Sequence, residues 1–274
     1  MKYGTLLRLS SVCEAPEKLA ALREFGMDAC QLIYKPEKYD TADALAIKKA
    51  AEDAGIEISA QFCGYRDSNC IWDTRFDFLN SGINSPFYGG ERVNYLLSAI
   101  PFMKALGVTD MVIHPGFIPN DPFADAYSRM LAAVGLLGTR LRAAGLNLLF
   151  ETGTESPISL LRLILDSGLD NLYINLDTAN PIMYGFGNPV DALYTFGKYV
   201  RNTHFKDGLP PTIPGKLGPE VAIGKGHVDF PKVVSMLKEL GYDRYVIIER
   251  EIGGEEQTRD ILGAMGDIKG LFES

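Results

Sequence analysis

One pattern recurs six times along the chain: a helix-like stretch ends at a glycine and is followed within a few residues by a short apolar run. The glycines are Gly26, Gly55, Gly107, Gly145, Gly168 and Gly241. Glycine just past a helix adopts the left-handed backbone conformation without steric cost, so each junction predicts a helix end, a tight turn and a strand start. Apolar runs at 5–9 and 199–205 bring the expected strands to eight.

Eight strands that alternate with helices in 274 residues give about 34 residues per unit. This length fits a strand, a crossover helix and two loops, and roughly 250 residues is typical of a (β/α)₈ barrel. We therefore expect one α/β domain over residues 1–274, a TIM barrel. A doubly wound open sheet is the alternative, but the chain has no GxGxxG after its first strand.

Two expected connections, at 63–90 and 206–228, are unusually long for a compact domain. Long loops of this kind are commonly lids or binding loops. The first contains several aromatic residues, including Trp72, the only tryptophan, which we expect to contact the substrate from a lid. The same aromatic residues could instead pack against the barrel rim or against a second copy of the chain, so a homo-oligomer stays open.

Composition excludes several classes of protein. With 46% hydrophobic and 23% charged residues the chain can bury a full core, which excludes disorder. A net charge of −8 argues against nucleic-acid and anionic-membrane partners. The four cysteines are scattered and no apolar run is long enough for a signal peptide or a membrane helix, so we expect a cytoplasmic protein.

Polar, metal-capable side chains follow five successive expected strands. In α/β barrels the active site lies at the C-terminal ends of the strands, so these side chains should meet over the barrel mouth. A single carboxylate at such a position is often only a helix N-cap, but five successive occurrences favour a functional site. The five residues are His114, Glu151, Asp177, His204 and Glu249.

Three of these five are carboxylates, and they would repel one another in a partly desolvated site unless a cation lay between them. Oxygen-rich ligation with one imidazole suits Mn²⁺, Mg²⁺ or Co²⁺, and Zn²⁺ is an alternative. We expect Glu151, Asp177, His204 and Glu249 to bind one divalent ion, with Mn²⁺ as the expected metal. His114, in a His-Pro-Gly turn, is interpreted as a substrate contact.

The sequence resembles the xylose isomerase-like barrels, which include sugar isomerases and epimerases, inosose dehydratases and type IV apurinic endonucleases. The likeness rests on the strand-end series, on HFKD at 204–207, and on GKGHVDF at 224–230 followed by GYDRYVIIERE. It implies that the four strand-end residues bind one divalent metal. In the 3-epimerases of this family the two glutamates also exchange the proton, which implies that Glu151 and Glu249 are the acid/base pair.

Two positions depart from these relatives. Many of them have a histidine three residues after the aspartate of strand six, where this chain has Asn180, which can form hydrogen bonds but cannot titrate. The related epimerases carry an arginine shortly after the strand-seven histidine, whereas this chain has Lys206, which could contact a substrate oxygen instead. Specificity for free ketohexoses is therefore in doubt.

The sequence thus predicts a metal-dependent sugar isomerase or epimerase that transfers a proton next to a carbonyl through an enediolate. A sugar-ketone dehydratase similar to inosose dehydratase could use the same site, and a non-catalytic sugar-binding barrel is the alternative outside enzymes. The hypothesis of an endonuclease is disfavoured because the chain has only three histidines and an acidic composition. The expected partner is a small sugar or sugar derivative.

Overall fold

A computed structural model of the protein describes residues 1–66 and 81–274. In this part of the chain, eight parallel strands close into a barrel in the order β1-β10-β7-β6-β5-β4-β3-β2. The expected TIM barrel is confirmed, and the open-sheet alternative is wrong because β1 pairs with both β2 and β10. The barrel strands are β1 (Lys2–Leu7), β2 (Ala29–Tyr34), β3 (Glu57–Cys63), β4 (Asp110–Ile113), β5 (Asn147–Glu151), β6 (Leu172–Asp177), β7 (Val200–Phe205) and β10 (Tyr245–Ile248).

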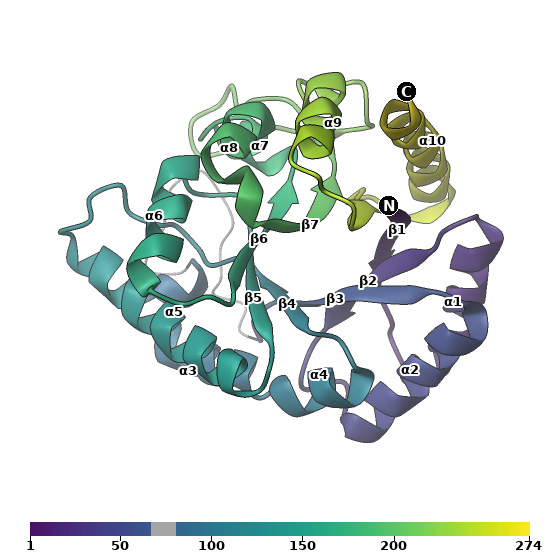
Figure 1. Cartoon of the computed structure of the whole chain (residues 1–274), viewed down its shortest axis with the longest axis horizontal. Coiled ribbons are helices and arrows are strands. Elements are labelled where there is room, and N and C mark those ends of the chain that lie inside the picture. Colours follow the sequence, from purple (N-terminus) through teal and green to yellow (C-terminus); the bar gives the residue numbers. More distant parts are fainter. Residues whose placement is uncertain (67–80) are drawn as a thin grey trace.

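Helices surround these strands, and the last helix lies beside the first strand (Figure 1). The described α-helices are α1 (Ala15–Glu24), α2 (Thr41–Ala54), α3 (Gly89–Leu97), α4 (Ile100–Leu106), α5 (Asp125–Ala143), α6 (Pro157–Ser167), α7 (Asn180–Tyr184), α8 (Pro189–Phe196), α9 (Phe230–Glu239) and α10 (Gly254–Glu273). Short 3₁₀ helices are η1 (Val12–Glu14), η2 (Gly82–Asn84) and η3 (Gly197–Tyr199).

The six glycine junctions lie where the sequence placed them. All six glycines have positive φ, between 65° and 86°, and each stands between a helix and the barrel strand that follows it. A side chain there would force an L-residue into the left-handed region, so glycine is the residue that permits these short turns.

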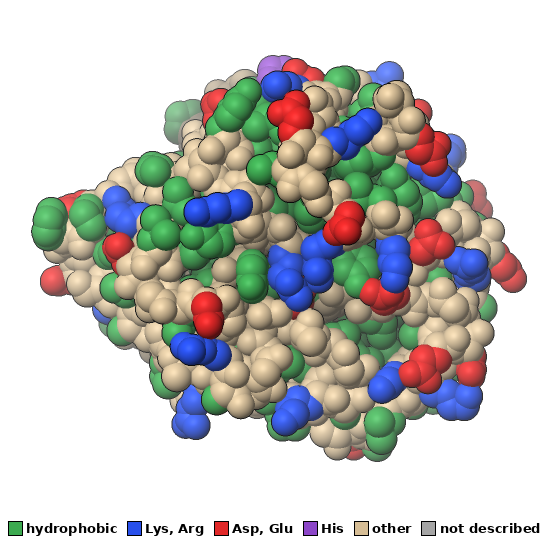
Figure 2. All heavy atoms as spheres, in the orientation of Figure 1, with side chains coloured by type: hydrophobic (Ala, Val, Ile, Leu, Met, Phe, Trp, Pro, Cys, Tyr) green, Lys and Arg blue, Asp and Glu red, His purple; other side chains and the backbone are tan. Residues whose placement is uncertain are grey.

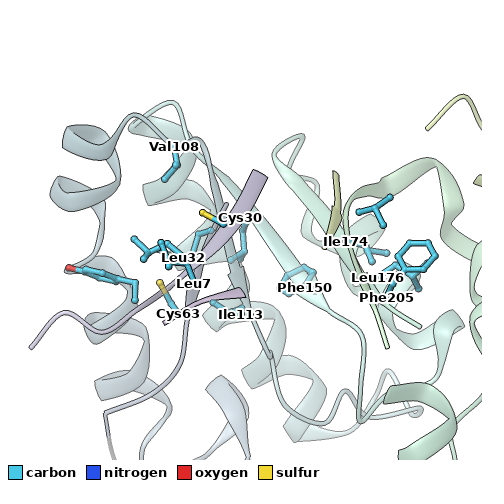
Figure 3. Close-up of a cluster of buried hydrophobic side chains, with 14 of the residues drawn as sticks. Leu7, Cys30, Leu32, Cys63, Val108, Ile113, Phe150, Ile174, Leu176 and Phe205 are labelled. Atoms are coloured by element: carbon cyan, nitrogen blue, oxygen red, sulfur yellow. The ribbon is translucent and has the colours of Figure 1, made fainter. Parts of the chain in front are cut away.

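The strands are buried on both faces, as parallel sheets covered by helices are. Side chains that point outward, such as Leu32, Phe150 and Phe205, are fully buried in the main core (Figure 3). A separate small cluster is formed by Ala60, Val112 and Leu149. Leu149 lies two residues before Glu151 on β5 and therefore points to the same side of the strand, into the barrel interior.

One strand boundary and the content of two expected loops differ from the sequence expectation. The first strand runs over Lys2–Leu7 rather than 5–9, because its pairing with β10 begins at Lys2. The expected loop at 63–90 lies partly outside the described residues, and its end contains η2 and the first turn of α3. The expected loop at 206–228 contains an antiparallel pair, β8 (Asp207–Gly208) and β9 (Glu220–Val221).

The surface carries no concentration of basic residues on the face drawn in Figure 2, where acidic and basic side chains are interspersed. No helix among the described residues is long and apolar enough to cross a membrane.

Candidate metal centre

The four strand-end residues meet at the C-terminal end of the barrel. Glu151 ends β5, Asp177 ends β6, His204 lies near the end of β7, and Glu249 directly follows β10. These strands are consecutive around the barrel, and Asp177 and His204 are register partners. One ligand atom from each residue lies within 4.8 Å of those of the others, and all four residues are buried.

The carboxylate of Asp177 is oriented by the backbone that follows it. Its Oδ1 accepts the N–H groups of Ala179 at 2.8 Å and Asn180 at 2.6 Å. Its Oδ2 is buried and accepts no hydrogen bond from residues 1–66 or 81–274. Thr152 adds a further restraint, because its Oγ1 accepts the N–H of Asp177 at 2.9 Å. One oxygen of Asp177 is therefore held by the chain and the other is left for the cluster.

His204 lies between the two glutamates. Its Nδ1 is 2.7 Å from Glu151 Oε1 and 3.1 Å from Glu249 Oε2. The other oxygen of Glu151 is 2.9 Å from Nε2 of His114, which follows β4. The two oxygens of Glu151 thus contact two different imidazoles, and both glutamates contact Nδ1 of His204.

The electrostatics follow from crowding charges in a buried space. Burial raises the pKa of Asp177 to about 7, although the ammonium of Lys206 opposes the rise. Burial would also raise the pKa of Glu151, but the imidazoles of His114 and His204 outweigh it and hold that pKa far below its usual range. For His204, burial disfavours the charged ring, yet the carboxylates, Glu151 foremost, raise its pKa to about 10. Without a metal, His204 therefore carries positive charge among the carboxylates.

Lys206 is buried beside the cluster rather than solvated in its loop. Its Nζ donates to the carboxylate of Glu251 and to Asn180 Oδ1, the latter at 3.4 Å. The same Nζ lies 3.9 Å from Asp177 Oδ2 and 3.9 Å from Glu249 Oε2. The nearby carboxylates outweigh the effect of burial and hold the pKa of Lys206 well above its usual value.

The structure brings together most of the predicted site residues. Glu151, Asp177, His204 and Glu249 form the cluster, and His114, Asn180 and Lys206 contact it through the bonds given above. Trp72, the predicted lid residue, lies outside the described residues.

Three further residues lie around the cluster and were not identified from the sequence. Gln31 of β2 is 2.8 Å from Nε2 of His204. Glu155 is buried in the loop after β5, where its Oε1 accepts the N–H of Gly153 at 3.1 Å. Tyr184 is buried on α7, and a methyl group on Gly153 would lie within 3.8 Å of its ring. Of the three, only Glu155 could have been found from the sequence, because it is a carboxylate four residues after Glu151, in the loop that follows the same strand.

Chemically, three carboxylates and one imidazole form an oxygen-rich donor set of the kind that binds Mn²⁺, Mg²⁺ or related divalent ions. Such a set at the mouth of a barrel can also hold and move protons, because two of its carboxylates are glutamates on separate strands.

The fold and site define a (β/α)₈ barrel with a buried carboxylate–histidine cluster at its C-terminal mouth. A sequence model of the xylose isomerase-like TIM barrel family matches residues 19–267, so the chain belongs to this family. Among curated proteins, it is 25% identical over 146 residues to the inosose dehydratase of Lacticaseibacillus casei. That match covers 46% of this chain and 48% of that enzyme, so this chain spans about half of that relative.

Solved structures have the same barrel. A xylose isomerase domain protein from Planctomyces limnophilus has a TM-score of 0.89 and 28% identity, over 98% of this chain and 96% of that one. The 3-keto-D-glucoside 4-epimerase of E. coli has a TM-score of 0.73 and 15% identity, over 98% and 99% of the two chains. A D-psicose 3-epimerase has a TM-score of 0.72 and 16% identity, and the two chains are covered completely, 100% of each. Sugar epimerases are thus among the structural neighbours.

Proposed function

We propose that the protein is a divalent-metal-dependent sugar isomerase or epimerase. The observation that carries the proposal is the buried cluster of Glu151, Asp177, His204 and Glu249, whose ligand atoms lie within 4.8 Å of one another. Structural neighbours that are sugar epimerases support it, at the level of the fold.

The residues present fit a metal ion. No group of the described residues donates a hydrogen bond to the buried Oδ2 of Asp177, and the three carboxylates of the cluster are all buried. Crowding three carboxylates into a buried space costs several kcal/mol, which a divalent cation would offset. When bound, the ion would act as a Lewis acid that stabilises negative charge on a substrate oxygen. Mn²⁺ is the ion we expect, and Mg²⁺, Co²⁺ and Zn²⁺ are alternatives.

In this proposal Glu151 and Glu249 are the acid/base pair. One glutamate removes the proton from the carbon next to the substrate carbonyl, and the other returns a proton, from the opposite face in an epimerase. Glu151 ends β5 and Glu249 follows β10, on either side of His204, so one glutamate could act as the base and the other as the acid. His114, Asn180 and Lys206 would contact the substrate oxygens, and Trp72 would cover them.

The charges around the cluster favour an uncharged sugar over a sugar phosphate. The basic side chains at the C-terminal ends of β7 and β10, Lys206 and Arg250, are both paired within the protein. Lys206 binds Glu251, and Arg250 lies 3.1 Å from Glu220 and 2.9 Å from Asp260. A phosphate placed beside the cluster at these two strand ends would therefore meet carboxylates and cations that are already paired, at a cost in electrostatic energy.

A dehydratase of a sugar ketone is the second candidate, because the partial match to inosose dehydratase favours it. After the proton is removed, the same site could expel a β-hydroxyl group instead of returning a proton. The product would then weigh one water less than the substrate, which separates this reaction from isomerisation.

The test is solvent deuterium exchange. Protein loaded with Mn²⁺ is incubated in D₂O with uncharged ketoses and keto-sugars, and deuterium and product are measured by NMR and mass spectrometry. Glu151→Gln and Glu249→Gln should each slow exchange by about 10²–10⁴-fold, the usual worth of a general acid or base. The matched control is Glu57→Gln, at the opposite end of the barrel on β3, which should exchange like the parent.

Sugar binding without exchange across the panel would refute the isomerase proposal and leave a sugar-binding barrel. Loss of water would favour the dehydratase instead.

A further inference from the structure

Gln31 reaches across the interior of the barrel to His204. It lies in the middle of β2 and is fully buried. In the order of the barrel strands, β2 and β7 are separated by β1 and β10 on one side and by four strands on the other. The distance from Gln31 Oε1 to His204 Nε2 is nevertheless 2.8 Å. Interior positions of such barrels are usually filled by branched apolar side chains, so an amide that spans the interior calls for an explanation.

The amide of Gln31 has a defined orientation. Its Nε2 donates to Asn175 Oδ1 on β6, at 3.3 Å. With its NH₂ group directed at Asn175, Gln31 presents its carbonyl oxygen to His204. That oxygen can only accept, so Nε2 of His204 carries a hydrogen both when the ring is charged and when it has lost the proton on Nδ1.

The hydrogen on Nε2 determines what the other ring nitrogen of His204, Nδ1, can do. Nδ1 of His204 faces Glu151 and Glu249, at 2.7 and 3.1 Å, and is therefore the atom that the ring contributes to the cluster. A neutral imidazole has one N–H and one lone pair. If Gln31 holds the hydrogen on Nε2, the lone pair lies on Nδ1, where a metal ligand is needed. The opposite tautomer would direct an N–H at the metal position.

We propose that Gln31 is a positioning residue that fixes the tautomer and orientation of His204 for metal binding. This inference rests on the proposed metal-dependent function and goes beyond it, because Gln31 would touch neither metal nor substrate. Partners of this kind typically change metal affinity by 10–100-fold when they are removed.

The first experiment measures Mn²⁺ affinity by titration calorimetry, without any substrate. Gln31→Leu removes the acceptor at similar volume and should weaken Mn²⁺ binding by about 10–100-fold. Gln31→Glu keeps an acceptor at the same reach and should restore most of the affinity.

The matched control is Gln61→Leu. Gln61 is equally buried on the neighbouring strand β3 but pairs in register with Leu32, on the opposite face of the sheet, and its Nε2 contacts Cys63 Sγ at 3.4 Å. It should bind Mn²⁺ like the parent. Equal losses in both leucine variants would mean that any buried substitution weakens the site, and the proposal would be wrong.

A second experiment leaves the chain unmutated, so it does not depend on whether a variant folds. The protein has three histidines, which makes their ring nitrogens assignable by ¹⁵N NMR. In protein loaded with diamagnetic Zn²⁺, His204 should show a protonated Nε2 with a slowly exchanging hydrogen and a metal-bound Nδ1. Metal on Nε2, or hydrogen on Nδ1, would overturn the proposal.

The outcomes separate this inference from the function on which it rests. If the parent protein binds Mn²⁺ and Gln31→Leu binds it equally well, the role of Gln31 is refuted and the metal site stands. If the parent protein binds no divalent ion, both are refuted.

Discussion

The buried carboxyl group of Glu155 has a pKa that is shifted by its surroundings. Its Oε1 accepts the N–H of Gly153 at 3.1 Å, while its Oε2 is buried and accepts no hydrogen bond within the part of the chain that the structure describes. Burial raises the pKa of Glu155 from 4.5 to about 7, against the smaller opposing effect of the hydrogen bond from Gly153. The folded protein therefore holds a proton at Glu155 more firmly than the unfolded chain does.

This gives Glu155 a defined effect on stability. Because its folded pKa is raised, its contribution is complete below about pH 4.5 and is lost as the pH rises to about 7. Glu155→Gln stays neutral and can keep the bond to Gly153. Above pH 7 the variant should therefore be more stable than the parent by up to about 3 kcal/mol, at 1.36 kcal/mol per pKa unit.

Urea unfolding at pH 5 and pH 8 measures this difference. The gain should be present at pH 8 and small at pH 5, and Glu17→Gln, on the surface of α1, should show no such gain. Equal stability of parent and Glu155→Gln at pH 8 would contradict the raised pKa.

At the scale of the element, one aspartate organises the connection after β7. The carboxylate of Asp207 accepts four backbone N–H groups: Gly208 and Val228 donate to Oδ1, and Gly224 and Gly226 donate to Oδ2, over 2.8–3.1 Å. A methyl group on Gly226 would lie 2.2 Å from Oδ1, so the chain closes tightly around this carboxylate. The loop that the sequence predicted as long and Gly/Pro-rich is therefore fixed beside the site.

Asp207→Ala should release this connection. It leaves four N–H groups without their acceptor, two of them on the buried residues Gly208 and Val228. At about 1–3 kcal/mol for each buried donor we expect a loss of about 2 kcal/mol or more. Trypsin cleavage at Lys216 and Lys225 should become faster, because both lie within the released segment. The control is Asp229→Ala, which removes only the N-cap bond to Lys232 of α9 and should cost about 1 kcal/mol. Identical cleavage of the two variants would refute the role of Asp207.

Elements differ in how well the sequence could predict them. The glycines that end helices and the strands that follow them are visible in short stretches of sequence. Because neighbouring parallel strands end side by side, the strand ends found in this way also predict the residues of the cluster. Helix α7 has five residues, too few for an apolar period, and the β8–β9 pair has two residues per strand. Gln31 could not be identified because its alignment with His204 depends on closure of the whole barrel.

At the scale of the whole molecule, closure of the barrel gives the site its shape. The register of β1 with β10 closes the ring. Within it, β10 pairs with β7, β7 with β6 and β6 with β5, which places Glu249 and Glu151 on either side of β7. Four elements distant in sequence therefore hold one cluster, so a ligand bound there stabilises the folded chain as a unit. An ion that binds only the folded state shifts unfolding by mass action.

Metal should therefore raise the melting temperature of the parent protein. At a Mn²⁺ concentration of 100 times Kd the gain is about 2.7 kcal/mol, or roughly 5–10 °C for a chain of this size. Metal binding must displace protons from His204, whose pKa is about 10, and from Asp177, whose pKa is about 7. At a fixed Mn²⁺ concentration the shift should therefore shrink as the pH falls from 8 to 6.

Differential scanning calorimetry with and without Mn²⁺, with metal analysis of the dialysed protein, makes the measurement. His204→Ala is the matched variant, because it removes the imidazole and leaves the three carboxylates. It should lose both the bound equivalent of metal and the thermal shift. A shift of equal size in parent and variant would place the stabilising ion elsewhere on the molecule and would remove the basis of the proposed chemistry.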